Sequence, residues 1–341
     1  MSDFGWPLYA SGVAEPLLLK MQATAILARP ERTEIRVQGK DVNVPSIRVR
    51  DRTVIAVGKW LKVASIHDEF FVEGEIVPEP DEFIAELKCW NLKPDLFTFA
   101  QKVSDLTPRF GFYSEWENFA VIPITTYKDW LKNRIGRGAR VNLHRAEREG
   151  VVVRAVPYDD HFVQGIKDLY DETPIRQGKP FWHHGKSFED IKKIHGTYRE
   201  RAEYIGAYFE GELIGFLKMV YVGNIAKTMN VIGKEKYFRK RPTNALIAKA
   251  VEICAEKGIA FLNYGQYRFP GRNESSLSDF KRRNGFQEFK FPRYYVPLTP
   301  KGKLALALGL YRDSKTFIPW TATKLLLQLR SRYYENRRRG E

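Results

Sequence analysis

The sequence is poor in cysteine and has no long apolar run. Only Cys89 and Cys254 occur among 341 residues, so we expect neither a disulfide framework nor a cysteine-rich metal site, and a reducing cytoplasm fits. The longest apolar stretch, Leu304 to Tyr311, is far shorter than the roughly 20 residues that cross a bilayer. No basic segment precedes an apolar core at the N-terminus, so no secretory signal is expected.

Several enzyme signatures are also absent. The sequence contains no Gly-x-Ser-x-Gly, P-loop, His-Glu-x-x-His or EF-hand pattern, which argues against the enzyme and calcium-binding classes that carry them. Hydrophobic residues make up 43% and charged residues 28% of the chain, which is ordinary globular usage. The length indicates about two domains, at roughly 150 residues each.

The positive charge is confined to the second half of the chain. Residues 1–150 hold 21 basic and 21 acidic residues, whereas residues 151–341 hold 35 basic and 20 acidic ones, which accounts for the net charge of +15. Such asymmetry indicates a half that meets a polyanion, namely nucleic acid, a nucleotide-like cofactor or an anionic membrane. A solubilising basic surface with no anionic partner is the alternative, and charge alone does not decide between them.

The first half alternates short β-rich segments with helical ones. Its clearest helix begins after Glu79, where acidic residues and a proline precede an apolar stripe. A Gly-Arg-Gly break at 136–138 is followed by a charged helix that Gly150 closes, and this helix is the expected bridge between domains. The expected strands are 52–57, 60–66 and 116–124, and the expected helices are 79–88, a segment from Thr126, and 139–149.

The second half has a regular order of elements. A strand at 151–157 precedes two helices at 159–173 and 188–200, and three strands follow at 204–209, 213–222 and 225–232. The last elements are a helix from Pro242, a strand at 261–264, a helix at 275–284 and a strand at 287–298. The order is therefore β-α-α-β-β-β-α-β-α-β.

That order, with the helix-to-strand junction Phe280-Lys-Arg-Arg-Asn-Gly-Phe286, resembles the GNAT superfamily of acyltransferases. A closer resemblance is to the Fem family of aminoacyl-tRNA-dependent peptidyltransferases and their FemAB-like relatives. Four segments carry it in chain order: Asn142 to Val153, Tyr170-Asp-Glu-Thr-Pro-Ile-Arg-Gln-Gly178, Ala207-Tyr-Phe-Glu-Gly-Glu-Leu-Ile-Gly215 and Ser278-Asp-Phe-Lys281.

The resemblance implies an α/β fold with a mixed twisted sheet flanked by helices, in two tandem GNAT-like units. Residues 1–150 would form a diverged first unit ending in a bridging helix, and residues 151–298 the acyltransferase unit. A basic helical extension, 299–341, would follow. An amphipathic basic helix there suits an anionic membrane or RNA, and packing across the domain junction is the alternative.

By the same resemblance, Lys281 and Phe280 are the expected catalytic residues. In Fem-type enzymes the Phe-Lys pair lies against the aminoacyl carbonyl, where an ammonium stabilises a developing oxyanion. Many GNAT enzymes carry a Tyr four residues before the Gly of Gly-Phe, but here that position is Lys281. The alternative is that Lys281 belongs to a solvated basic helix face together with Arg282 and Arg283.

A basic turn before the helix at Pro242 is the expected donor site. Acyl-CoA-using GNAT enzymes carry glycines in this turn, whereas this chain has none between Gly233 and Gly258. That departure favours the end of a tRNA over coenzyme A, with Tyr237 and Phe238 available for base stacking. A solvated basic loop is the alternative. The expected donor-binding residues are Lys236, Arg239, Lys240, Arg241, Thr243 and Asn244.

A second set of polar and aromatic residues is expected to hold the acceptor. The two histidines fit an acceptor or, less well, a metal; with no cysteine or spaced carboxylates nearby, we expect no metal site. Ordinary surface and core roles are the alternative for each. The acceptor residues are Tyr170, Arg176, His183, His184, Asn230 and Tyr264.

The sequence therefore predicts a cytoplasmic N-acyltransferase of the GNAT/FemAB-like type that transfers an aminoacyl or acyl group to an amine, with aminoacyl-tRNA as the favoured donor. No permanently bound cofactor is expected. The acceptor is an amine on a peptide, a peptidoglycan precursor or a small metabolite, and contact with the inner face of the membrane would come through the C-terminal extension. The alternatives are an acyl-CoA-dependent N-acetyltransferase and a non-catalytic RNA- or membrane-binding module.

Overall fold

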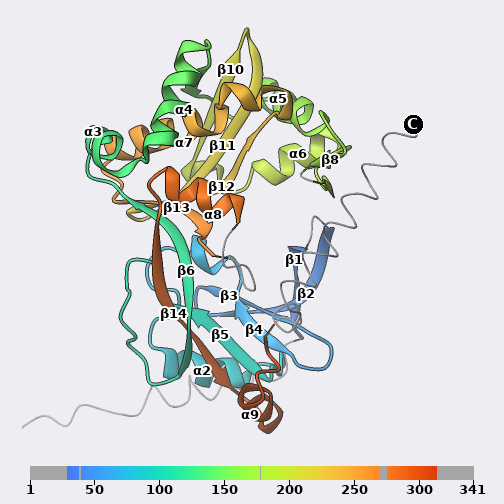
Figure 1. The fold of residues 1–341 in the computed structure, drawn as a ribbon. Coiled ribbons are helices and arrows are strands. Elements are labelled where there is room, and N and C mark those ends of the chain that lie inside the picture. The colour runs from blue at the N-terminus through green and yellow to red at the C-terminus, as the bar shows by residue number, and fades with distance from the viewer. Residues whose placement is uncertain (1–28, 38–39, 177, 269–274, 313–341) are drawn as a thin grey trace, which may run out of the picture.

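The computed structural model describes residues 29–37, 40–176, 178–268 and 275–312, which form a mixed α/β fold (Figure 1). Its main sheet has 12 strands in the order β1-β2-β3-β4-β5-β14-β6-β13-β12-β11-β10-β7. Most neighbouring strands are antiparallel, but β4 with β5 and β12 with β13 run parallel. The predicted fold class, a mixed twisted sheet flanked by helices, is confirmed.

The first half supplies six strands of this sheet. Its elements are β1 (Glu31–Val37), β2 (Lys40–Val49), β3 (Arg52–Val57), β4 (Val63–Ile66), η1 (Glu69–Phe71), α2 (Pro80–Cys89), β5 (Leu96–Ala100) and β6 (Tyr113–Pro123). Three short helical elements lead into the second half: α3 (Tyr127–Asp129), the π-helical η2 (Trp130–Arg134) and α4 (Arg137–Arg148).

The second half supplies the other six strands and most of the helices. Its elements are β7 (Val152–Ala155), α5 (Asp160–Tyr170), β8 (Ile175–Arg176), β9 (Lys179–Pro180), α6 (Phe188–His195), η3 (Arg199–Arg201), β10 (Ala202–Phe209), β11 (Glu212–Val222), β12 (Ile225–Gly233), η4 (Glu235–Lys240), α7 (Pro242–Glu256), β13 (Phe261–Gln266), α8 (Ser276–Arg283), β14 (Gln287–Pro297) and α9 (Pro300–Ala307).

The order predicted for the second half is confirmed, apart from the small β8–β9 hairpin. Helix starts match because polar caps define them: Asp159 accepts a hydrogen bond from Phe162 N at 2.8 Å, and Ser187 accepts one from Asp190 N at 3.1 Å. The helix predicted to run to residue 200 ends at His195, and Gly196 is its C-cap. The strand predicted from Trp60 begins only at Val63.

The two halves repeat one arrangement of strands. In the first, β2, β3 and β4 form an antiparallel meander, and a crossover through α2 places β5 parallel to β4. In the second, β10, β11 and β12 form the meander, and a crossover through α7 places β13 parallel to β12. We call these the first unit and the second unit.

The units exchange their last strands. The first unit's β6 pairs with β13 of the second unit, and the second unit's β14 pairs with β5 of the first. The exchanged strands also pair with each other, from Gln287 opposite Val121 to Tyr295 opposite Tyr113. One sheet therefore runs through both units, and Figure 1 shows β6 and β14 side by side between them.

Helices cover the second unit on both faces. On one face α4 and α7 pack over the sheet in a core that includes Leu143, Leu246 and Leu262. On the other face α5 and α6 pack over β10 and β11 around Phe162 and Phe216. The first unit has its own core, rich in phenylalanine, between α2 and the sheet.

The short helix α9 is fixed to the first unit. Thr299 caps it by accepting a hydrogen bond from Gly302 N at 3.0 Å, and its hydroxyl donates to Asp95 Oδ1 at 2.9 Å. A Cβ at position 302 would lie 1.9 Å from Asp95 O, so only glycine permits this close approach. Within the predicted extension, the basic helical stretch at 321–334 and Arg337 to Arg339 lie outside the described residues.

Candidate active site

The candidate site lies where the parallel pair β12–β13 stops. The two strands pair only from Ile225 opposite Phe261 to Lys227 opposite Asn263, although β12 continues to Gly233. The ladder between β11 and β12 shifts at the same level, so Met229 has no partner on β11. We call this point the open end of the β12–β13 pair.

Helix α8 brings Lys281 to the open end. Ser275 caps α8 by accepting a hydrogen bond from Ser278 N at 3.0 Å, and Ser278 Oγ donates to Tyr267 O at 2.8 Å, just after β13. The side chain of Lys281 is 2% exposed. Its ammonium donates to Gln266 O at 2.6 Å and lies 4.6 Å from the ring centre of Tyr264.

Burial sets the electrostatics of this pair. It lowers the pKa of Lys281 to about 8 and raises the pKa of Tyr264 well above its usual range. Because a pKa of about 8 lies above neutrality, the Lys281 side chain is mainly a buried cation at pH 7. Such a cation can stabilise a negative charge that develops within reach.

A hydrogen-bonded ladder holds α8 against α7. Asn244 Nδ2 donates to Asn284 Oδ1 at 3.0 Å, Asn284 Nδ2 donates to Phe280 O at 2.8 Å, and Trp130 Nε1 donates to Asn284 O at 3.1 Å. The Phe280 ring packs against the core under α7. Asn244, predicted to bind the donor, thus lies in a buried contact that positions the Lys281 helix.

In the basic turn before α7, several backbone N–H groups and lysine ammonium groups already have partners within the protein. Backbone N–H groups of Glu235 and Lys236 donate to the carboxylate of Glu172 at 2.7 and 2.9 Å. The Lys236 ammonium lies over the Tyr237 ring at 5.0 Å, and that of Lys240 over the Phe209 ring at 3.7 Å. A carboxylate of the protein therefore occupies the first amides of η4, where a phosphate was expected.

Other cations of the turn differ in exposure. Arg239 is exposed, whereas Arg241 adopts a left-handed backbone conformation with φ of 60° at the start of α7. The Nε of Arg241 is buried and meets no hydrogen-bond acceptor among the described residues. Thr243 is half-buried in the first turn of the helix.

The predicted acceptor residues lie mainly on the opposite face of the second unit. Tyr170 is buried, its hydroxyl is 2.9 Å from His195 Nε2, and its ring stacks on His183 at 4.5 Å. Burial raises the pKa of Tyr170. His184 is exposed on the same loop as His183.

Arg176, at the edge of this face, contacts the end of β12, the loop after β9 and η4. Its Nη2 donates to Gly233 O, and its guanidinium lies 5.5 Å from the ring centres of both Phe181 and Phe238. Burial lowers the pKa of Arg176, and its Nη1 is buried with no acceptor among the described residues. Arg176 therefore connects the loop after α5 to the basic turn.

Lys218 was missed by the sequence analysis although it lies at the centre of this face. It is fully buried on β11, directly opposite Asn230 of β12, and donates to His195 O at 2.9 Å and Thr197 O at 2.6 Å. Burial lowers its pKa to about 8. A lone lysine inside the apolar strand Glu212–Val222 was the available signal, because a buried charge requires partners.

The predicted site residues therefore form two groups. Lys281, Phe280 and Tyr264 come together at the open end on the α7 side of the sheet, whereas Tyr170, His183 and Asn230 lie on the α5–α6 side.

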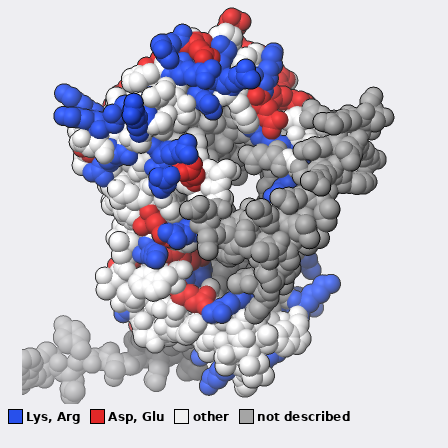
Figure 2. All heavy atoms as spheres, viewed as in Figure 1, with Lys and Arg blue, Asp and Glu red and all other residues white. Residues whose placement is uncertain are grey.

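Figure 2 shows Lys and Arg groups gathered over the second unit, in the upper part of the view. Across the described ranges, no group of His, Cys, Asp and Glu is arranged to hold a metal ion.

No helix in the part of the chain that the structure describes has both the length and the apolar content needed to cross a bilayer.

The comparisons with known proteins identify the fold. No family model matches the chain, and no curated protein matches its sequence. FemX matches with a TM-score of 0.54 and 11% identity, over 77% of this chain and 87% of that one. The C-terminal domain of a lysylphosphatidylglycerol synthetase from Agrobacterium fabrum, itself described as putative, matches with a TM-score of 0.50 and 12% identity, over 86% and 96%. The resemblance predicted from the sequence is therefore confirmed at the level of architecture: this chain has the fold of FemX.

Proposed function

We propose that this chain is an acyltransferase that moves an aminoacyl or acyl group from an activated donor to an amine, with aminoacyl-tRNA as the favoured donor. The shared fold supports the reaction class. The neighbour from Agrobacterium fabrum is the C-terminal domain of a protein described as a putative lysylphosphatidylglycerol synthetase, and that product carries an aminoacyl group. The observation that carries the proposal is the buried ammonium of Lys281 at the open end of the β12–β13 pair.

The reaction is a direct displacement. The amine attacks the carbonyl carbon of the donor ester, a C–N bond forms, and the carbonyl oxygen becomes an oxyanion that Lys281 stabilises. Collapse of this intermediate breaks the C–O bond of the ester, and the proton lost by the amine passes through solvent to the released hydroxyl. Orientation and electrostatic stabilisation supply the rate, with no covalent bond to the enzyme.

The basic turn supports a tRNA donor rather than coenzyme A. Glu172 occupies the first amides of η4, so a pyrophosphate would have to displace a carboxylate of the protein there. Beside it, the exposed side chains of Arg239 and Phe238 suit a phosphate and a nucleobase. Arg241 and Thr243 follow at the start of α7, and we place them near the sugar-phosphate backbone of the same tRNA end.

We place the acceptor amine at the open end of the β12–β13 pair, where the strands no longer pair and a group that enters from the α5–α6 side, past Tyr170, Arg176 and Asn230, can meet the carbonyl beside Lys281. The buried Arg176 guanidinium suits a carboxylate or phosphate on a peptide, a peptidoglycan precursor or a smaller amine. His183 and His184 lie on the loop that borders this approach.

The experiment measures donor binding and transfer with the purified full-length chain. Charged tRNA, uncharged tRNA and acetyl-CoA are compared by filter binding and thermal shift over a salt series, and a panel of amines is assayed with radiolabelled donor. We expect charged tRNA to bind more tightly than uncharged tRNA, with acetyl-CoA producing no thermal shift.

Two outcomes would contradict the proposal in different ways. Stabilisation by acetyl-CoA, with only weak and salt-sensitive tRNA binding, would replace the donor by acyl-CoA and keep the reaction class. Equal binding of charged and uncharged tRNA, with no transfer from either donor to any amine, would indicate a non-catalytic RNA-binding module.

A further inference from the structure

The end of the first unit that carries α9 exposes large apolar side chains. Leu304 and Leu308, one helical turn apart, are 59% and 60% exposed, and Leu310 is 46% exposed. The side chain of Trp60 is also exposed, at 61%. It lies beside α9, because Lys301 Nζ of α9 donates a hydrogen bond to Trp60 O at 2.8 Å. We call Trp60, Leu304, Leu308 and Leu310 the α9 face.

The α9 face is held in place by the body of the protein. Lys301 Nζ lies 2.9 Å from the buried carboxylate of Asp95, which also accepts hydrogen bonds from Lys62 N and from the Thr299 hydroxyl. Burial raises the pKa of Asp95, but these hydrogen bonds and the Lys301 charge outweigh it and hold the pKa below its usual range. Apolar groups presented on a fixed helix can bind a partner without first being ordered.

Cations surround this apolar face. The segments that carry Lys62, Lys93 and Asp95 are joined by the hydrogen bond from Asp95 N to Lys62 O, at 2.8 Å. In Figure 2 the lower end of the molecule, where α9 lies in Figure 1, is largely white with Lys and Arg groups at its margin. The exposed lysines of these segments are Lys59, Lys62, Lys93, Lys301 and Lys303.

The acidic groups at this end are largely engaged. Asp95 is buried against Lys301, and three carboxylates of α2 and its N-cap, those of Glu79, Glu82 and Glu86, all bind Arg50. Glu115 binds Arg312 and the Tyr311 hydroxyl. Lys301 is bound to Asp95, so Lys59, Lys62, Lys93 and Lys303 supply the outward-facing charge around the α9 face.

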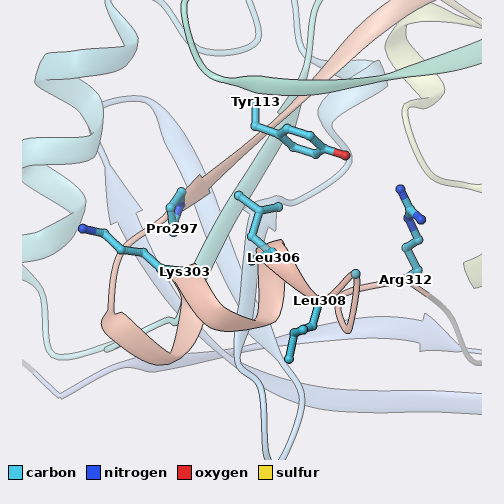
Figure 3. Close-up of a pocket in the computed structure, with 8 residues that line it drawn as sticks. Tyr113, Pro297, Lys303, Leu306, Leu308 and Arg312 are labelled. Carbon is cyan, nitrogen blue, oxygen red and sulfur yellow. The ribbon is translucent and has the colours of Figure 1, made fainter.

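A hollow lies against α9 on its inner side. It has a volume of about 610 Å³, and Figure 3 shows Lys303 and Arg312 at its two ends, Leu306 and Leu308 between them, and Tyr113 opposite. Apolar walls with Lys303 at one end suit an amphiphile with an anionic head, whereas Arg312 at the other end is paired with Glu115. This is the chemistry of a phospholipid.

We propose that the α9 face lies on an anionic lipid surface. Leu304, Leu308 and Trp60 enter the boundary between headgroups and acyl chains, and the surrounding lysines lie among the lipid phosphates. The apolar groups supply attraction that salt does not weaken, and each lysine near an anionic surface strengthens binding roughly fivefold. Neither contribution depends on whether the second unit is an acyltransferase.

The test is cosedimentation of the full-length chain with vesicles. Vesicles of phosphatidylcholine alone are compared with vesicles that contain 30% phosphatidylglycerol, a composition we choose as a strongly anionic surface. The doubly substituted variant Leu304→Ser/Leu308→Ser removes the apolar groups, and Lys62→Glu/Lys303→Glu reverses the charge without touching the Lys301–Asp95 pair. The matched controls are Leu106→Ser/Val141→Ser, which are exposed apolar residues elsewhere, and Lys128→Glu/Lys132→Glu, which have the same change in net charge.

We expect the wild-type chain to bind the anionic vesicles at least about tenfold more tightly than the neutral ones. Both α9 variants should bind at least about tenfold more weakly than wild type, with both controls close to wild type. Brominated phosphatidylglycerol should quench tryptophan fluorescence, and Trp60→Phe should remove most of that quenching. Circular dichroism shows whether each variant is folded.

Three results would overturn the proposal. Absence of binding to anionic vesicles would exclude a lipid surface. Unchanged binding by folded α9 variants would move the contact elsewhere, for instance to residues 313–341. A dimer that Leu304→Ser/Leu308→Ser dissociates, in a chain that binds no vesicles, would show that a second copy covers the α9 face.

Discussion

The two units share a strand order but fill their parallel strand pairs differently. In the first unit, every residue of β5 is buried, and Phe97 and Phe99 stack within a cluster of phenylalanine and tyrosine rings. In the second unit, the corresponding pair β12–β13 itself carries the buried polar residues Thr228 and Asn263, and the buried Lys281 of α8 lies against β13. The same topology thus gives a closed aromatic core in one unit and a polar site in the other.

The difference shows which of the two units accommodates buried lysine side chains. Aromatic packing stabilises the first unit, and no lysine within the described residues 41–66 of its meander is buried. The second unit buries Lys218 and Lys281, and desolvation of their two charges lowers its stability. Under the proposed function, the first unit is the scaffold and the second unit carries the proposed reaction. The predictions below test this division.

The largest effect is expected at the junction of the units. Arg293 of β14 binds Glu69 of η1 and Glu117 of β6, at 2.8 Å for the latter, and these two carboxylates raise its pKa although burial opposes them. Arg293→Met leaves two carboxylates without their cation, so we expect a loss of about 3–5 kcal/mol in the free energy of unfolding, measured by urea denaturation.

The control for this variant is Arg109→Met, which removes an exposed pair with Glu75 and Asp105. Its expected loss is below about 1 kcal/mol. Equal effects of the two substitutions would show that the junction is no stronger than the surface, and the division into scaffold and reactive unit would lose its structural basis.

Lys281→Met is expected to remove transfer activity while the chain stays folded. Loss of one oxyanion-stabilising group typically costs about 10²–10³-fold in rate, and methionine replaces a buried lysine with little change in volume. Arg282→Met is the matched control, because Arg282 is exposed on the same helix and pairs with Asp279. Transfer by Lys281→Met at the wild-type rate would exclude Lys281 from the reaction.

The pH dependence of stability distinguishes the units further. Burial lowers the folded-state pKa of Lys218 to about 8, below the roughly 10.4 of an unfolded lysine. Between these values the unfolded chain binds more protons, so stability rises with pH by at most about 1.4 kcal/mol per pH unit for this residue. This added stability is lost again as the pH falls from roughly 10.4 to about 8.

Lys218→Met should remove the share of this rise that belongs to Lys218 and so reduce the slope, which thermal denaturation at pH 8 to 10 would measure. Lys257→Met, at an exposed lysine that pairs with Glu203, is the control and should leave the slope as in wild type. A slope that Lys218→Met does not change would mean that the pKa of Lys218 in the folded chain is close to that of an unfolded lysine, so that burial does not lower it.

The smallest expected effect is at Glu172. Glu172→Gln weakens two hydrogen bonds to the backbone of η4, so we expect about 1 kcal/mol less stability, measured by thermal denaturation. Glu256→Gln, at the exposed end of α7, is the control. If Glu172→Gln also restores binding of acetyl-CoA, the carboxylate is what excludes that donor.

Local patterns in the sequence were enough to predict much of the second unit. Apolar periodicity and capping residues located α5, α7 and α8, because those signals lie within a few residues of each helix. They did not reveal that β14 pairs with β5, about 190 residues away in the chain, since pairing between distant strands leaves no local pattern.

The site was predictable only in part for a similar reason. The resemblance picked out Lys281, and the structure brings its ammonium to Tyr264. It did not reveal Lys218 or His195, whose contacts join β11 to the end of α6. Asn244 looked like a donor ligand from its place at a helix start, but its partner Asn284 lies on another element that only the tertiary structure brings near.

The exchange of β6 and β14 also governs how the protein can be made. During synthesis, one edge of β5 has no partner until residues 287–297 leave the ribosome, and by then most of the chain has emerged. An exposed strand edge invites pairing with other chains. The first unit cannot be completed as an independent folding step, so chains truncated before β14 should be substrates for chaperones or prone to aggregate.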